Sequence, residues 1–278
     1  MTSLRTLTAL ILAPIAIAAV LLLPTPWMMA VGAVLFLGAL WEWLRLADVE
    51  DSLARGVLLL ANLALMVALV WASRTPSGFS WVLLELMVVV GMLWWLLALL
   101  WLGRYDFASD HDTHARAFKL AAGTLAVVPA WCALGVIHGG GPTGHRWLLL
   151  AIAMVWAADT GAYFVGRRFG RHKLAPRISP NKTIEGLAGG LLAGVAVALA
   201  GAPLAGASLA QLPAVALVAL LAVATSVVGD LFESLLKRHV GVKDSGHLVP
   251  GHGGILDRLD GVLAALPAFA LGKAVLGF

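Results

Sequence analysis

The feature that most constrains this chain is a series of continuous apolar runs, each close to 20 residues long. Hydrophobic residues make up 61% of the chain and charged residues only 12%, whereas soluble domains are about 45–50% apolar and about 25% charged. So much apolar surface requires a lipid environment, where backbone polar groups are satisfied within helices or closed barrels. The runs lack the two-residue alternation of barrel strands, and their length suits helices that cross a hydrocarbon core about 30 Å thick. The sequence therefore predicts an all-α, polytopic transmembrane protein.

Hydropathy and charge together predict the topology. About nine spans are expected, at 7–23, 27–44, 56–72, 81–102, 118–138, 146–166, 184–204, 212–232 and 260–277. With the N-terminus inside, 16 of the 19 basic residues fall in inside segments, and Arg74, Arg146 and Lys273 fall outside. Because inside loops are enriched in Lys and Arg, we expect the N-terminus inside and the C-terminus outside. This topology also accounts for the net charge of +4 without nucleic acid as a partner.

The two halves of the chain differ in where their polar residues lie. Residues 1–145 have short loops, and their acids, including Glu42, are assigned mostly to those loops; this half is expected to be a scaffold of transmembrane helices. Residues 146–278 carry two long polar inside loops, 167–183 and 233–259, and are expected to form the catalytic region.

Three glycines, Gly186, Gly190 and Gly194, are spaced four residues apart in the seventh predicted span. Small residues at this spacing let helix backbones approach closely. We therefore interpret them as a helix-packing face.

Asp159 and Thr160 interrupt an apolar span about two turns from its inside end. A carboxylate deep in a helix costs about 2.5–3.5 kcal/mol on insertion scales, so it normally faces a partner, an ion or a water-filled cavity. The alternative is a hydrogen bond between helices made by a protonated Asp159.

The stretch from Ser179 to Gly186 predicts a helix start. Asn181 or Thr183 is expected to cap the helix, with Glu185 in its first turn. Free N–H groups beside Lys182 would make a good anion site. The alternative is a simple cap next to ordinary positive loop charge.

The stretch from Gly229 to Gly261 is the richest in acids, bases and glycines. Asp230 and Glu233 share one face if this part is helical, and Asp257 and Asp260 are three apart, so they project together on a helix. Acids that converge repel one another unless a cation lies between them. Carboxylates without cysteine favour Mg²⁺ over zinc. The alternative is a charged loop that solvates itself through ion pairs.

At these residues the chain resembles the phosphatidate cytidylyltransferases, also called CDP-diacylglycerol synthases. The resemblance is strong from about residue 150 to the end. It rests on Lys237-Arg238, Lys243-Asp244, Pro250, His252-Gly253-Gly254 and Asp257-Arg258-Leu259-Asp260, and upstream on Asp159-Thr160, Tyr163, Ser179-Pro180-Asn181-Lys182-Thr183 and Glu185-Gly186.

The resemblance implies that CTP and phosphatidic acid react to give CDP-diacylglycerol and pyrophosphate, with Mg²⁺, at the cytoplasmic face of a bacterial plasma (inner) membrane. The catalytic residues it implies are Asp230, Lys237, Arg238, Lys243, Asp244, His252, Asp257, Arg258 and Asp260. The substrate-binding residues are Asp159, Ser179, Asn181, Lys182, Thr183, Glu185, Gly253 and Gly254. The metal ligands are Asp230, Asp257 and Asp260. A second, monovalent cation and a homodimer are left open.

Other classes of protein fit the residues less well. A transporter or channel would also place acids within spans, but it does not explain the loop from His252 to Asp260. A CDP-alcohol phosphatidyltransferase would need an Arg where Ala265 stands and two further Asp residues downstream. An enzyme that uses CTP on a polyprenol or an archaeal ether lipid is a closer alternative. The chain has neither a GxxxxGK[ST] loop nor a GxGxxG fingerprint, and a metal site at 110–114 is less favoured than a solvated loop.

Overall fold

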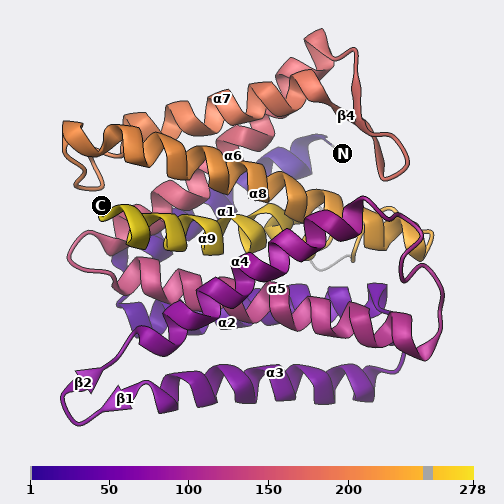
Figure 1. Ribbon diagram of the computed structural model, residues 1–278, viewed down its shortest axis with the longest axis horizontal. Helices are drawn as coiled ribbons and strands as arrows, with labels where there is room; N and C mark the ends of the chain where they lie inside the picture. Colours follow the sequence, from indigo (N-terminus) through magenta and orange to yellow (C-terminus); the bar gives the residue numbers. More distant parts are fainter. Residues whose placement is uncertain (1, 247–252) are drawn as a thin grey trace.

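The computed structural model describes residues 2–246 and 253–278, with side chains from Leu12 onward. Nine α-helices of 18 to 28 residues dominate this part of the chain (Figure 1). They are α1 (Thr2–Leu22), α2 (Thr25–Leu46), α3 (Ser52–Ala72), α4 (Val82–Leu102), α5 (Thr113–Gly139), α6 (Gly144–Phe169), α7 (Ile184–Gly201), α8 (Leu212–His239) and α9 (Leu256–Leu276). The short elements are β1 (Arg74–Thr75), β2 (Gly78–Phe79), β3 (Lys173–Ala175), β4 (Ser179–Thr183) and the 3₁₀ helix η1 (Leu209–Gln211).

Eight helices in the described part of the chain, α2 to α9, are long and apolar enough to cross a membrane. In α1 the described side chains begin at Leu12, and Leu12–Leu22 is apolar as well. The predicted fold class, an all-α polytopic membrane protein, is confirmed.

Several helices begin earlier than hydropathy predicts, because their first turns are polar and capped. Asp51 accepts hydrogen bonds from the Leu53 and Ala54 N–H groups, both at 3.1 Å, and so starts α3. Asp112 accepts from the Ala115 N–H at 2.6 Å at the start of α5. A cap of this kind satisfies N–H groups that have no partner inside the helix.

Helices α6 and α7 pack closely through the glycine face of α7. A Cβ atom added to Gly190 would lie 2.9 Å from the Ala158 carbonyl oxygen of α6, and one added to Gly194 would lie 3.0 Å from the Met154 oxygen. The predicted helix-packing role of these glycines is confirmed.

Helix α8 is held against the N-terminal half by an aromatic cluster around Phe232. The Phe232 ring stacks on Trp43 of α2 at 5.8 Å and meets the Trp94, Trp95 and Trp101 rings of α4 edge-on at 5.2–6.4 Å. Such ring pairs add directional packing to the burial of apolar area. The polar face of α8 is therefore fixed relative to α2 and α4.

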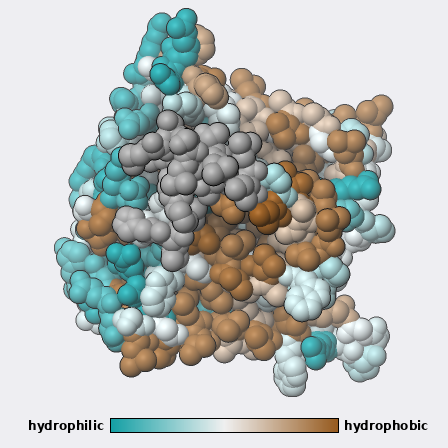
Figure 2. Space-filling model, turned by 180° about the vertical axis from the view of Figure 1, so that it is seen from behind, coloured by the Kyte–Doolittle hydropathy of each residue, from teal (hydrophilic) through white to brown (hydrophobic). Residues whose placement is uncertain are grey.

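Figure 1 shows the N-terminus, the β3–β4 hairpin, the end of α8 and the start of α9 at one end of the bundle, with the C-terminus at the other. Figure 2 shows the molecule from behind, so the end with the N-terminus and the hairpin lies at the left. Hydrophilic residues gather at this end, and hydrophobic residues cover the middle of the bundle. This arrangement brings the predicted inside segments together. The compartment that they face stays a prediction.

Both predicted polar loops are shorter than expected. Helix α8 continues to His239 and α9 begins at Leu256, so residues 233–239 and 256–259 of the predicted loop 233–259 are helical. Leu235 and Leu236 are fully buried, and this apolar packing continues the helix beyond its lipid-facing part. The predicted loop 167–183 contains the end of α6 and the antiparallel hairpin β3–β4.

Candidate active site

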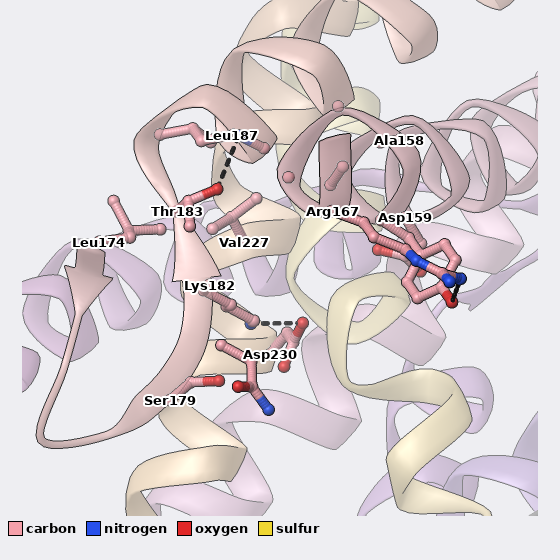
Figure 3. A pocket seen from close by; sticks show the side chains of 16 residues that line it. Ala158, Asp159, Arg167, Leu174, Ser179, Lys182, Thr183, Leu187, Val227 and Asp230 are labelled. Atoms are coloured by element: carbon pink, nitrogen blue, oxygen red, sulfur yellow. Dashed lines mark hydrogen bonds and ion pairs between the residues drawn. The ribbon is translucent and has the colours of Figure 1, made fainter. Parts of the chain in front are cut away.

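A pocket of about 610 Å³ opens where α6, β4, α7 and α8 meet at the polar end of the bundle. It contains five of the predicted substrate-binding residues and one predicted metal ligand (Figure 3). They are Asp159, Ser179, Asn181, Lys182, Thr183 and Asp230. Residues 71 positions apart in the chain, from α6 to α8, thus line one cavity.

The centre of this pocket is an ion pair between Lys182 of β4 and Asp230 of α8. The Lys182 Nζ atom lies 2.5 Å from Asp230 Oδ2, and both side chains are partly exposed to the cavity. Asp159 of α6 lies close enough to Asp230 for their carboxylates to repel each other, and close enough to Lys182 and Arg258 to be attracted by them. Positive and negative groups therefore face the same space.

Two residues at the start of α7 shape the rim of the pocket. Thr183 is the cap of α7, because its side-chain oxygen accepts a hydrogen bond from the Gly186 N–H at 3.1 Å. Glu185 turns away and accepts from the Arg171 N–H at 3.0 Å and from His172 Nδ1 at 2.6 Å. Thr183 thus stands where a binding residue was predicted, and Glu185 orders the hairpin instead of lining the pocket.

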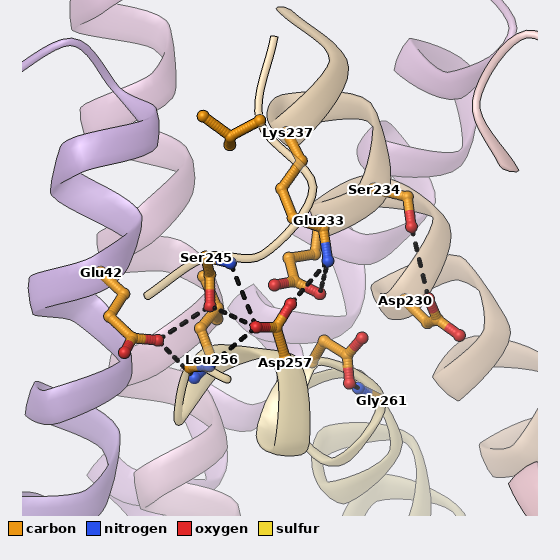
Figure 4. Close-up of polar contacts among 12 residues, drawn as sticks. Glu42, Asp230, Glu233, Ser234, Lys237, Ser245, Leu256, Asp257 and Gly261 are labelled. Atoms are coloured by element: carbon orange, nitrogen blue, oxygen red, sulfur yellow. Dashed lines mark hydrogen bonds and ion pairs between the residues drawn. The ribbon is translucent and has the colours of Figure 1, made fainter. Parts of the chain in front are cut away.

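A second polar group, which we call the anchor cluster, consists of Glu42, Lys237, Ser245 and Asp257 (Figure 4). Lys237 Nζ lies 2.7 Å from Asp257 Oδ1 and 3.1 Å from Oε2 of the buried Glu233. Ser245 donates through its N–H to Asp257 Oδ2 at 3.1 Å. The cluster ties the end of α8 to the start of α9.

The two acids of α9 have different surroundings. Oδ2 of Asp257 accepts from the Ser245 and Gly254 N–H groups at 3.1 and 2.9 Å and lies 3.0 Å from the Ser245 hydroxyl oxygen, and its Oδ1 faces Lys237. Asp260 lies instead beside the acids of α8, Asp230 and Glu233. Asp257 therefore links the first turn of α9 to Ser245 and to the end of α8, whereas Asp260 belongs to the acids next to the pocket.

These surroundings bear on where a divalent cation fits. The described residues hold no ready-made group of three His, Cys, Asp or Glu side chains with ligand geometry. Asp159, Asp230 and Asp260 nevertheless lie near enough to repel one another, and carboxylate oxygens in such a group suit Mg²⁺. Asp257 could offer only Oδ1, which Lys237 holds in this structure.

The remaining predicted residues are spread around the two groups. Arg238 braces the hairpin, with Nε donating to the Ile178 carbonyl at 3.1 Å. Lys243 and Asp244 are exposed in the connection, and Arg258 is exposed on α9. His252 lies outside the described residues.

Gly253 and Gly254 lie next to protein groups. Gly253 has a φ of +88°, which favours glycine. A Cβ atom on it would lie 3.2 Å from Asp257 Oδ2, and one on Gly254 would overlap Ser245 and Glu42. The backbone at both glycines therefore passes close to the side chains of the anchor cluster.

Glu42 was not among the predicted site residues, although it lies in one of the predicted spans. It lies within α2, with 1% of its surface exposed. A usable signal was present, because residue 42 falls inside the predicted span 27–44, and an ionisable residue within a span usually has a function. Ser245 carried no comparable signal.

Cations and carboxylates that line one cavity at the polar end of a membrane protein can hold and neutralise phosphate groups, directly or through a metal ion. A sequence model of the Cytidylyltransferase family matches residues 3–275. The chain belongs to this family.

Curated relatives agree with this assignment. The phosphatidate cytidylyltransferase of Pseudomonas aeruginosa is 41% identical over 267 residues, which cover 96% of this chain and 94% of the relative. The enzyme of the same name from Haemophilus influenzae is 35% identical, with 96% of each chain covered. The Staphylococcus epidermidis enzyme of that name is 48% identical over 124 residues, which cover 45% of this chain and 47% of the relative. The resemblance seen in the sequence is thereby confirmed.

Proposed function

We propose that this membrane protein transfers the cytidylyl group of CTP to phosphatidic acid, giving CDP-diacylglycerol and pyrophosphate in phospholipid biosynthesis. The names of the full-length relatives support this activity. The observation that carries it is the pocket in which Lys182 faces Asp230 and Asp159, at the end of the bundle where a lipid headgroup and a soluble nucleotide can meet.

In this reaction a phosphate oxygen of phosphatidic acid attacks the α-phosphorus of CTP. A new P–O bond forms, the bond from the α-phosphorus to the oxygen that bridges to the β-phosphorus breaks, and pyrophosphate leaves with that electron pair. The nucleophile is already an anion near neutral pH, so a strong general base is not required. The obstacle is repulsion between charged phosphates, and catalysis consists of positioning and charge neutralisation.

The residues of the pocket can supply both the positioning and the charge neutralisation. Lys182 can exchange Asp230 for a phosphate oxygen without leaving the cavity, and Arg258 lies near Asp159 at its edge. Ser179 and Asn181 add hydroxyl and amide groups on β4. Lys237, Arg238, Lys243 and Asp244 are proposed to act from the neighbouring end of α8 and its connection to α9, together with His252.

Mg²⁺ is the proposed cofactor, with Asp230 and Asp260 as ligands and Asp159 beside them. When bound, it would neutralise oxygens of the triphosphate. Asp257 stays a predicted ligand through Oδ1, provided that Lys237 moves away. A second, monovalent cation stays a prediction.

The proposed location is the bacterial plasma (inner) membrane, with the N-terminus and the pocket on the cytoplasmic side. The concentration of basic residues in segments that share one end of the bundle supports this orientation. CTP would then reach the pocket from the cytosol and phosphatidic acid from the inner leaflet. Residues 1–145 are proposed as scaffold and 146–278 as the catalytic region, and a homodimer stays a prediction.

The test is release of pyrophosphate by purified protein in mixed micelles. We expect release only when CTP, phosphatidic acid and Mg²⁺ are all present. Asp257→Ala should insert normally and abolish turnover, and Lys243→Met, an exposed change nearby, should fold like the wild type. Turnover on a polyprenyl phosphate but not on phosphatidic acid would replace the proposed substrate, and flux of a solute without use of CTP would favour a transporter.

A further inference from the structure

Glu42 is a buried carboxylate that the proposed reaction does not use. It lies near the end of α2, on the N-terminal half of the chain, and 1% of its surface is exposed. A buried carboxylate is costly unless donors surround it. Its donors come from the far end of the sequence, more than 200 residues away.

One oxygen of Glu42 accepts hydrogen bonds from two groups, one in the connection after α8 and one in the first turn of α9. Oε2 accepts a hydrogen bond from the Ser245 hydroxyl at 2.8 Å and from the Leu256 N–H at 2.9 Å (Figure 4). Leu256 is the first residue of α9, and Ile255 before it has no side chain that can cap the helix. Glu42 therefore satisfies an N–H group that α9 cannot satisfy itself.

Ser245 links Glu42 to Asp257. Its hydroxyl lies 2.8 Å from Glu42 Oε2 and 3.0 Å from Asp257 Oδ2. Asp257 in turn faces Lys237 at 2.7 Å. A continuous chain of polar contacts thus runs from α2 through the connection to the last turns of α8.

The backbone at two glycines, Gly246 and Gly254, passes very close to the Glu42 side chain. Cβ atoms on Gly246 or Gly254 would overlap its side chain, so only glycine lets the connection pass this close. Asp260 lies one turn further along the helix whose start Glu42 holds. Any shift of that start moves Asp257 and Asp260 relative to α8.

We propose that Glu42 is a positioning residue for the reaction, which fixes the start of α9 and so sets Asp257 and Asp260 against Asp230 and Lys237. This inference rests on the proposed function. Glu42 is placed to touch no substrate, so its loss should disturb the geometry of catalysis more than the binding of CTP.

The variants are Glu42→Gln, which keeps an acceptor oxygen in place, and Glu42→Ala, which removes it. We expect kcat to fall about tenfold for Gln and about 100-fold for Ala, as for misplaced catalytic groups, with KM for CTP within about twofold of the wild type. Glu85→Gln, an exposed acid in the first turn of α4, is the matched control and should leave both constants unchanged.

Hydrogen–deuterium exchange supplies a readout that needs no activity. The first turn of α9 should exchange faster in Glu42→Ala than in the wild type, with Glu42→Gln in between and α4 unchanged. If the wild type releases no pyrophosphate from CTP and phosphatidic acid, the proposed function fails, while exchange still reports whether Glu42 holds α9.

Three outcomes would overturn the proposal. They are wild-type kcat in both variants, an effect on KM for CTP alone, and lost activity without faster exchange at Leu256. Failure of even Glu42→Gln to fold would assign Glu42 to stability and would overturn it as well.

Discussion

Lys237 offers the most direct test of how the anchor cluster is held together. Its Nζ atom lies 2.7 Å from Asp257 Oδ1 and 3.1 Å from Glu233 Oε2. The side chains are little exposed, at 10% for Lys237, 12% for Asp257 and 1% for Glu233. Lys237→Met keeps the length and apolar stem of the side chain but removes the charge. Both carboxylates then lose their nearest cation.

The expected loss of stability follows from this burial. Removing one partner of a buried ion pair typically costs about 3–5 kcal/mol, because the other charge stays behind uncompensated. Asp257 keeps its contacts with Ser245 and the Gly254 N–H, so Glu233 carries most of this cost. We therefore expect Lys237→Met to lower the free energy of unfolding by about 3–5 kcal/mol.

The measurement is unfolding by SDS in mixed micelles, followed by fluorescence of the tryptophans around Phe232. Adding Glu233→Gln to Lys237→Met should recover about 1–3 kcal/mol, since it removes the unpaired charge. Lys243→Met is the matched control, and as an exposed change it should stay within about 0.5 kcal/mol of the wild type. A loss below about 1 kcal/mol for Lys237→Met, or no recovery in the double variant, would refute this account of the cluster.

Four further predictions follow from the pocket and the bundle. Lys182→Met should lower kcat/KM for CTP about 10–150-fold, since a hydrogen bond from a charged group contributes about 1.5–3 kcal/mol. The control Arg177→Met, outside the pocket, should change kcat/KM less than about twofold. Equal losses in the two variants would contradict a specific role for Lys182. Chelation with EDTA should stop pyrophosphate release and added Mg²⁺ should restore it; activity that survives EDTA would exclude the proposed cofactor. Gly190→Ala should destabilise the protein by about 1–3 kcal/mol because its Cβ would meet the Ala158 carbonyl. The control Gly56→Ala, whose Cβ would have no atom within 4 Å, should not destabilise it. Equal thermal stability of the two variants would count against close packing of α6 on α7. A reporter fused to the C-terminus should read outside the cytoplasm, and a cytoplasmic signal would reverse the proposed topology.

The transmembrane architecture was predictable from the sequence because it depends on composition along the chain. Apolar runs near 20 residues located the helices, and the four-residue spacing of Gly190 and Gly194 identified a packing face. Thr183 was one of two expected caps, and its short polar side chain is the one that accepts the Gly186 N–H. Such local signals survive folding because they involve neighbours in the chain.

The helix ends were less predictable, since hydropathy measures transfer to lipid and not burial in protein. Lys237 and Glu233 lower the apolar average at the end of α8, yet Leu235 and Leu236 are buried there and continue the helix. The hairpin β3–β4 was not predicted, because it contains Pro180 and is fixed by backbone pairing of Lys173 with Thr183.

Asp257 and Asp260 have different surroundings, although they are identical residues three apart on one helix. Their spacing alone could not predict this difference. Asp257 lies in the first turn of α9, where the Gly254 N–H and the Ser245 groups reach it, while Asp260 lies one turn further, against α8. The N–H groups that contact Asp257 come from Ser245 and Gly254, which precede α9, and the Ser245 hydroxyl is hydrogen-bonded to Glu42 in α2.

The predicted division at residue 145 therefore describes composition better than it describes contacts. Trp95 of α4 donates through its ring N–H to the Leu263 carbonyl of α9 at 3.2 Å, and Glu42 of α2 holds the Leu256 N–H at 2.9 Å. Both contacts fix α9, the helix that carries Asp260, from the N-terminal half. A chain cut at this boundary would leave the Leu256 N–H without its acceptor, so the helices before residue 145 help to determine where the acids of the site lie.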